Sequence, residues 1–249
     1  MSNKNNSIDN ACRILLVLSE QQSGINLTDL SLQMGINKST AYRYLSTLEK
    51  YRMIRKKDNR YYLGLRIFEL GNRVPVIRMI LERIYPRLLE LGFLFNETIS
   101  VGVLSDSEVV ILERIEKGRS LVNQVFTGTK VPLYCTGLGK AILSVMPDEH
   151  RDTLLAETHF EKLTSRTITT LDRLLKDLEE IRKRGYSIDD SEYEEDLKCV
   201  AVPLEFTNLG IYSAVSVTGP RSRMKCERAG YIGGHLRQAV DSFMQEMTE

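Results

Sequence analysis

Residues 27–63 constrain the fold most, because they contain two short helical patterns joined by a glycine and followed by a basic hairpin. The first pattern places apolar side chains at helical spacing, at Leu27, Leu30 and Met34. Thr28 is the expected N-cap of this helix, and Gly35 fits the left-handed residue that commonly ends one. Two such helices with a hairpin behind them predict a winged helix-turn-helix.

The second helical pattern begins at Asn37, another suitable N-cap. Its apolar residues Ala41, Leu45 and Leu48 share one face, which must pack inward. The opposite face is polar, short-chained and basic, and it carries no carboxylate. Such a face fits the major groove of DNA, where arginine bonds guanine and hydroxyl groups bond phosphates or base edges. The residues expected to contact DNA from this helix are Lys38, Ser39, Thr40, Tyr42, Arg43 and Ser46.

A basic hairpin follows, with Asp58 and Asn59 as its turn. We expect Lys56, Lys57 and Arg60 to lie along the DNA backbone or in the minor groove. The alternative is a solvated run of charge behind an ordinary helical hairpin, as a lone basic run commonly is. Here the run follows two capped helices at the spacing of a winged helix-turn-helix, which favours DNA binding.

The length and charge of the chain predict two domains. Its 249 residues, 42% of them hydrophobic, can bury a sizeable core, and the helix-turn-helix accounts for a minor part of them. Residues 1–75 contain 12 Lys and Arg against 6 Asp and Glu, a balance of +6, whereas residues 76–249 contain 22 against 27, a balance of −5. An anionic partner such as double-stranded DNA therefore belongs to the N-terminal part.

The cysteines and histidines are too few and too scattered to form a recognisable metal site. Cys12, Cys135, Cys199 and Cys226 show no paired spacing with one another or with the three histidines. A reduced, cytoplasmic protein without metal or cofactor is the simplest expectation. No apolar run approaches the ~20 residues of a transmembrane helix, and the N-terminus lacks the apolar core of a signal peptide. We therefore expect no membrane as a partner.

Helical patterns precede and follow residues 27–63. A first helix, capped by Ser7, has one apolar stripe that we expect to face the core: Ile8, Ala11, Cys12, Leu15 and Leu16. After the hairpin, a short linker helix is expected to end near Gly71. A longer helix over 76–95 contains Pro86, which predicts a kink or a break.

The C-terminal part mixes strand and helix patterns, which predicts an α+β domain. Runs rich in β-branched residues predict strands over 98–104, 108–115, 121–126, 199–206 and 211–218, the last two joined by a turn over 207–210. Helical periodicity and capping residues predict helices over 137–146, from 148, over 171–184 and over 223–247.

Several fragments, in order, give the chain a resemblance to the IclR family of bacterial transcriptional regulators. They are Ser7–Leu15, Asn37–Arg43, Tyr61–Gly64, Pro132–Ala141, Arg184–Asp190, Cys199–Pro203 and Ser216–Pro220. The resemblance covers nearly the whole chain. It implies a winged helix-turn-helix over 1–64, a linker helix over 65–80, and a GAF-like α+β effector-binding and oligomerisation domain over 81–249. It also implies homodimers that commonly pair into tetramers.

The resemblance further implies an effector pocket in the C-terminal domain. The family's ligand-binding positions correspond here to Gly137, Leu138, Asp189, Cys199, Ser216 and Thr218. Leu138 departs from the family, because a smaller residue often stands there, and this departure would narrow the pocket or change the size of ligand it accepts.

Physical reasoning supports an anion at the start of the helix near Gly137. Gly137 and Leu138 lie where a loop enters this helix, so their N–H groups and the helix dipole favour a carboxylate, as in a small organic acid or sugar acid. The side chains expected to bond the ligand's polar remainder are Asp189, Ser216 and Thr218, with Val131 and Leu197 as apolar walls. Without the resemblance, ordinary roles in packing, strand surfaces and turns would be favoured for all of them.

These patterns predict a ligand-responsive transcriptional regulator, expected from family habit to be a repressor, which binds a palindromic operator and responds to a small carboxylate-type metabolite. One alternative is a constitutive architectural DNA-binding protein whose large domain only assembles protomers. A second alternative is a cysteine-dependent enzyme, but Cys199 has no histidine nearby in a nucleophile motif.

Overall fold

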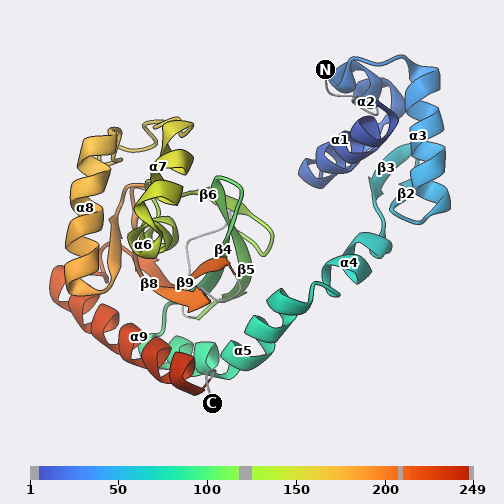
Figure 1. Cartoon of the computed structure of the whole chain (residues 1–249). Helices are drawn as coiled ribbons and strands as arrows, with labels where there is room; N and C mark the ends of the chain where they lie inside the picture. Colours follow the sequence, from blue (N-terminus) through green and yellow to red (C-terminus); the bar gives the residue numbers. More distant parts are fainter. Residues whose placement is uncertain (1–5, 118–124, 207–209, 247–249) are drawn as a thin grey trace. The chain divides into compact units, whose positions relative to one another are not determined.

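A computed structural model describes residues 6–117, 125–206 and 210–246 (Figure 1). Its contacts divide the chain into two compact units, Met1–Met79 and Ile80–Glu249. Each unit has its own hydrophobic core, so each is described separately.

The first unit is a winged helix-turn-helix, as the sequence predicts. Its helices are α1 (Asn6–Glu20), α2 (Leu27–Met34), α3 (Lys38–Lys50) and α4 (Leu65–Gly71), and its strands are β1 (Ile25–Asn26), β2 (Ile54–Lys57) and β3 (Arg60–Leu63). The strands form an antiparallel sheet in the order β1-β3-β2. Strand β1, which the sequence patterns do not reveal, consists of only two residues and pairs with β3.

The turns of this unit have the predicted geometry. Gly35 ends α2 with φ +65°, and Asn37 caps α3 by accepting a hydrogen bond from the Thr40 amide at 2.8 Å. Asp58 and Asn59 both have positive φ, as the tight turn of a hairpin requires. The N-cap of α2 differs from the prediction: Asn26, not Thr28, accepts the Asp29 amide at 2.9 Å, so α2 starts earlier.

Helix α1 buries a different face from the predicted one. Ile14 and Leu18 pack into the core, whereas Ile8 and Leu16 are 63% and 65% exposed, and Cys12 is exposed as well. The predicted stripe is therefore wrong for Ile8, Cys12 and Leu16, whereas Leu15 is half-buried against the core. Ser7 lies inside α1 rather than capping it. Ile8, Cys12 and Leu16 instead form an exposed apolar row at a spacing of four residues.

Residues 65–80 contain a short helix and the start of a longer one, as the sequence patterns predict, so the linker helix over 65–80 that the family resemblance implies is interrupted at 72–74. Helix α4 ends at Gly71, as expected, and α5 (Pro75–Phe95) begins with proline. Pro75 suits this position because the first residue of a helix needs no backbone N–H. Helix α5 continues through Pro86 to Phe95, so this proline does not end it.

The second unit contains an antiparallel sheet of six strands in the order β6-β5-β4-β9-β8-β7. The strands are β4 (Thr98–Ser105), β5 (Glu108–Ile115), β6 (Lys130–Pro132), β7 (Ser187–Asp190), β8 (Leu197–Phe206) and β9 (Ile211–Pro220). Four of these confirm predicted strands, whereas β6 and β7 are short and were not predicted. Most of the strand predicted over 121–126 lies outside the described residues, as does most of the turn over 207–210, and the described remainder of the former, Val125 and Phe126, is not strand.

Helices cover both faces of this sheet (Figure 1). Helix α6 (Gly137–Val145) packs on β8 and β9, with α8 (Leu171–Arg184) beside it. Helix α9 (Cys226–Glu246) packs on the opposite face, where it meets the part of α5 that belongs to this unit. Helix α7 (Asp148–Ala156) follows α6. Of the helices in the described ranges, none is long and apolar enough to cross a membrane.

Candidate DNA-binding face and ligand cavity

The residues predicted to contact DNA lie on the surface of the first unit. On α3, Lys38, Ser39, Tyr42, Arg43 and Ser46 are exposed and Thr40 is half-buried. Ala41 and Leu45 are fully buried behind them, which fixes the polar face outward. Lys56, Lys57 and Arg60 on the wing are also exposed.

One groove joins part of this set. Lys38 and Tyr42 from α3 line it together with Lys56 and Arg60 from the wing. The Arg60 guanidinium also donates a hydrogen bond to the Gly24 carbonyl at 2.8 Å, so this arginine helps to hold the wing in place. Ser39, Thr40, Arg43, Ser46 and Lys57 lie outside the groove. The start of α2 completes it, with Asn26, Thr28 and Asp29, which no sequence pattern assigned to the site.

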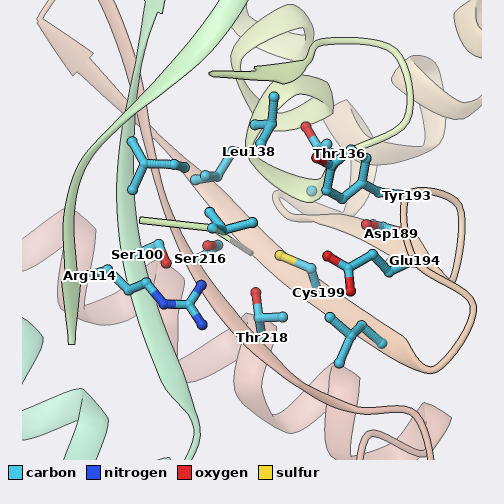
Figure 2. Close-up of a pocket in the computed structure, with 15 residues that line it drawn as sticks. Ser100, Arg114, Thr136, Leu138, Asp189, Tyr193, Glu194, Cys199, Ser216 and Thr218 are labelled. Carbon is cyan, nitrogen blue, oxygen red and sulfur yellow. The ribbon is translucent and has the colours of Figure 1, made fainter. Parts of the chain in front are cut away.

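The second unit contains a cavity between the sheet and the start of α6 (Figure 2). All six positions predicted to bind ligand line it: Gly137, Leu138, Asp189, Cys199, Ser216 and Thr218. Val131 and Leu197 line it as well, in agreement with the predicted apolar walls. The atom-free space, including the mouth to solvent, measures ≈ 510 Å³.

Strand pairing explains why these residues meet. Asp189 on β7 pairs with Cys199 on β8, which in turn pairs with Thr218 on β9. Directly paired residues point to the same face of a sheet, so these three side chains form one row. Ser216 stands two residues before Thr218 and therefore points to the same face.

The start of α6 forms the opposite wall. Thr136 caps the helix: its hydroxyl accepts the Gly139 amide at 3.0 Å and donates to the Pro132 carbonyl at 2.6 Å. The helix's own hydrogen bonds begin further on, so the Gly137 and Leu138 amides belong to the open end that favours anions. A Cβ on Gly137 would lie 2.7 Å from the Cys199 Sγ, which explains the glycine at this position.

Asp189 is the most strongly perturbed acid of the cavity. Burial and, next in size, the charge of Glu192 raise the pKa of its carboxyl to about 7, while the nearby Lys140 opposes the change. Its Oδ1 accepts the Glu192 amide at 2.6 Å, which fixes the carboxyl at the end of β7. Near neutral pH, Asp189 can therefore either donate or accept a hydrogen bond.

Cys199 has the opposite character to a nucleophile. Burial, together with the charge of Asp189, raises the pKa of its thiol to about 12. A reactive cysteine requires a lowered pKa and a base within reach. The Cys199 side chain therefore serves as a small, weakly polar part of the cavity wall.

Several lining residues were missed by sequence reasoning. They are Ser100, Ile111, Arg114, Val125, Thr136, Tyr193 and Glu194. Arg114 was missed because of a bulge in β5: Val101 pairs with Glu113 but Gly102 pairs with Ile111, so Leu112 is an extra residue. The bulge reverses the alternation of faces and turns Arg114, rather than Glu113, to the face that carries Ile111. Only the break in the apolar alternation near Leu112 could have signalled this.

An exposed basic helix-turn-helix in one unit and, in the other, a cavity lined by both apolar and polar side chains define a class: the ligand-responsive, DNA-binding transcriptional regulators. Comparison with known protein families places the chain within this class. The IclR helix-turn-helix domain matches residues 7–58, and the C-terminal domain described as bacterial transcriptional regulator IclR C-terminal matches residues 76–244. The chain belongs to the IclR family of bacterial transcriptional regulators.

Individual relatives agree along most of their length. The HTH-type transcriptional regulator KdgR of Escherichia coli (strain K12) is 33% identical over 237 residues, which cover 94% of this chain and 89% of that protein. The transcriptional repressor IclR of the same organism is 28% identical over 238 residues, covering 94% and 87%. Among solved structures, the Thermotoga maritima IclR is 27% identical with a TM-score of 0.76, covering 98% of this chain and 99% of that one.

The fold also matches more distant structures. An IclR homolog from Microbacterium hydrocarbonoxydans, solved in complex with 4-hydroxybenzoate, has a TM-score of 0.85 at 19% identity and covers 96% of this chain and 99% of that one. At this identity the likeness concerns the fold.

Proposed function

We propose that the protein is a repressor that binds a palindromic operator and changes its affinity when a small carboxylate-type metabolite fills the cavity. The observation that carries the proposal is the convergence of the six predicted ligand positions, from α6, β7, β8 and β9, on one cavity. The names of relatives support the direction of regulation, since they include the transcriptional repressor IclR of Escherichia coli and the acetate operon repressor of Salmonella typhimurium.

In this proposal, Lys38, Ser39, Thr40, Tyr42, Arg43 and Ser46 contact the major groove, and Lys56, Lys57 and Arg60 contact the backbone or the minor groove. The Gly137 and Leu138 amides bind the ligand's carboxylate, while Asp189, Cys199, Ser216 and Thr218 contact its remainder. The protein acts in the cytoplasm without metal, cofactor or catalytic activity, and the raised pKa of Cys199 supports the absence of thiol catalysis.

The protomers form a homodimer that pairs into a tetramer. Exposed apolar side chains on the first unit support self-association: Ile8 and Leu16 on α1, and Leu65 and Phe68 on α4. A dimer places two recognition helices on half-sites related by its two-fold axis. Sedimentation of the purified chain measures the oligomeric state, and a monomer at micromolar concentration would contradict this part of the proposal.

The test begins with selection of duplexes from a random pool, followed by binding titrations on the enriched sequence. We expect the selected sequence to be an inverted repeat. The protein's affinity for it should change by about 1–3 kcal/mol when the right acid is added. Thermal shifts with a panel of organic and sugar acids identify that acid, since a ligand at 100 times its dissociation constant stabilises a protein by about 2.7 kcal/mol. Selection of an operator without any thermal shift would favour the architectural alternative.

A separate measurement addresses the enzyme alternative. The alkylation rate of Cys199 is compared with that of a free cysteine at neutral pH. We expect a much slower rate, because a buried thiol with a raised pKa provides little thiolate. A rate faster than that of free cysteine would contradict the assignment of Cys199 to the cavity wall.

A further inference from the structure

A buried arginine faces the ligand cavity from the side opposite to α6. The Arg114 side chain is 6% exposed, and the residue is one of those that line the cavity. Its guanidinium extends from β5 toward Ser216 and Thr218 (Figure 2). Its Nε donates to the Glu116 carboxylate at 3.0 Å, which orients the plane of the group. None of the interactions in the proposed function uses this arginine.

The register of the sheet places Arg114 in a polar row. Arg114 on β5 pairs with Ser100 on β4, and Ser100 pairs with Ser216 on β9. These three residues therefore share the face of the sheet that carries the cavity. The bulge at Leu112 is the local cause, because it turns Arg114 to this face, where three neighbouring strands present polar groups.

The chemistry of the guanidinium limits what it can bind. Arginine keeps its positive charge at every pH a protein meets, and its planar fork matches the two oxygens of a carboxylate or phosphate. The acids that line the same cavity compete with a ligand for that fork, and Asp189 competes less than a surface acid because burial raises its pKa to about 7. Burial raises the pKa of Glu194, whereas the charge of Arg114 lowers it.

The two anion-binding ends lie at opposite sides of the cavity. Gly137 lies against β8, since a Cβ there would lie 2.7 Å from the Cys199 Sγ and 3.5 Å from the Ala201 Cβ. Arg114 starts from β5, three strands away in the order β5-β4-β9-β8. Three inter-strand steps correspond to about 14 Å between backbones, and the arginine side chain spans part of it. A short acid with an oxyanion at each end would span the remainder of this distance.

We propose that the effector is an acid with two oxyanion groups, one at the Gly137 and Leu138 amides and the second at Arg114. This inference rests on the proposed function and specifies the ligand class. The shared chemistry is a second carboxylate or a phosphate group. Ser100 and Ser216, in the same row as Arg114, supply hydroxyl donors and acceptors between the two ends.

The experiment compares matched acids on the full chain by calorimetric titration. Succinate, glutarate and adipate are the dicarboxylates, phosphoglycolate is the phosphorylated acid, and butyrate, pentanoate and hexanoate are monocarboxylates of matched length. We expect one doubly charged acid to bind about 10- to 100-fold more tightly than its monocarboxylate, as a charged hydrogen-bonded pair would give. Tighter binding of a dicarboxylate identifies the second oxyanion as a carboxylate, and tighter binding of phosphoglycolate identifies it as a phosphate.

Variants of the arginine test its role. In Arg114→Gln we expect the doubly charged acid to fall to the affinity of the monocarboxylate, while monocarboxylate affinity stays unchanged. Arg114→Lys keeps the charge without the fork and should be intermediate. Arg173→Gln, an exposed arginine on α8, is the control that should retain the preference. Thermal melts without ligand show whether each variant is folded, and Arg114→Lys replaces Arg114→Gln if the latter is not.

Two results would overturn this inference but leave the proposed function standing. One is equal affinity for dicarboxylates, phosphoglycolate and monocarboxylates in the unaltered protein. The other is equal loss of all acids in a folded Arg114 variant, which would assign the arginine a purely structural role. If none of the acids bound, including those of the wider panel above, the proposed function itself would fail.

Discussion

The Lys140 ammonium donates a hydrogen bond to the Glu192 carboxylate at 2.5 Å, and the Glu192 amide in turn donates to Asp189 at 2.6 Å. Lys140, on α6, therefore supports the cavity acid through a single intermediate residue. The same ammonium also donates to Asp177 on α8 and to the Ile188 carbonyl on β7, each at 2.7 Å. One buried cation thus joins α6, α8 and β7 behind the cavity.

Replacing this cation should strongly destabilise the second unit. The Lys140 side chain is 1% exposed; burial by itself would lower its pKa, but Glu192 and Asp177 raise it, so it stays charged. Lys140→Met keeps the volume but leaves Glu192 without its cation and Asp177 with only the longer contact to Arg184, at 3.9 Å. We expect a loss of about 3–5 kcal/mol in the free energy of unfolding, measured by urea denaturation. Lys176→Met, at an exposed position on α8, is the control, expected within about 0.5 kcal/mol of the unaltered protein. Similar curves for the two variants would contradict this role.

The raised pKa of Asp189 predicts how stability depends on pH. The folded protein holds this proton up to about pH 7, whereas the unfolded chain releases it near the ordinary value of 3.8. The contribution of Asp189 to the free energy of unfolding is therefore full below about pH 4. It is lost as pH rises to about 7, and the loss is on the order of 4 kcal/mol. Asp189→Asn removes this titration and keeps an oxygen for the Glu192 amide.

The measurement is the difference in unfolding free energy between the unaltered protein and Asp189→Asn at several pH values. We expect Asp189→Asn to become more stable relative to the unaltered protein as pH rises from 4 to 7. Asp190→Asn is the neighbouring control with the opposite sign. Burial raises the pKa of Asp190, but Lys198 and Arg166 lower it by more, so its pKa lies below the ordinary value. The stability that Asp190 contributes is therefore lost as pH falls below 4. A pH-independent difference for Asp189→Asn would contradict the assigned pKa.

Local sequence determined the features that were predicted correctly. Gly35, Asn37 and the Asp58–Asn59 turn each satisfy a backbone requirement within a few residues, so their sequence is sufficient to locate them. The cavity positions were found because family motifs mark them, although they come from four separate elements. Periodicity alone would have assigned ordinary roles to Asp189, Ser216 and Thr218.

The features that were missed depend on tertiary structure. Simple alternation along β5 places Glu113 on the same face as Ile111, but the extra residue Leu112 reverses the alternation and places Arg114 there instead. On α1, both sides carry apolar residues, so the pattern could not show that Ile14 and Leu18 face the core and Ile8 and Leu16 do not. Short strands such as β1 exist because a neighbour pairs with them, and their own sequence is uninformative.

The contact between Gly137 and Cys199 can be tested with a double-mutant cycle. Gly137→Ala places a Cβ 2.7 Å from the Cys199 Sγ, so we expect a loss of about 1–3 kcal/mol in stability. Cys199→Ala removes that sulfur, and the double variant should recover part of the loss, with a coupling of at least about 0.5 kcal/mol. Gly234→Ala on α9, where a Cβ would meet nothing within 4 Å, should be neutral or stabilising by up to about 1 kcal/mol. Strict additivity of the two single changes would contradict a direct contact between these residues.

The last prediction separates base contacts from phosphate contacts on the first unit. Arg43 lies on the exposed face of α3, and Lys56 lies on the wing. Arg43→Ala should weaken binding to the selected operator by about 1–3 kcal/mol and relax base preference, because arginine discriminates guanine through two hydrogen bonds. Lys56→Ala should weaken binding to all duplexes and reduce the slope of log affinity against log salt by about 1, because one phosphate contact is lost.

Fluorescence anisotropy at several salt concentrations, on operator and on random duplexes, distinguishes the two outcomes. Arg13→Ala, an exposed arginine on α1 outside the proposed face, is the control that should leave both affinities unchanged. Equal losses on operator and random DNA for Arg43→Ala would show that this residue binds phosphate, since a phosphate contact carries no direct sequence information. A loss for Lys56→Ala on the operator alone would instead place the wing in a groove, where it contacts base edges.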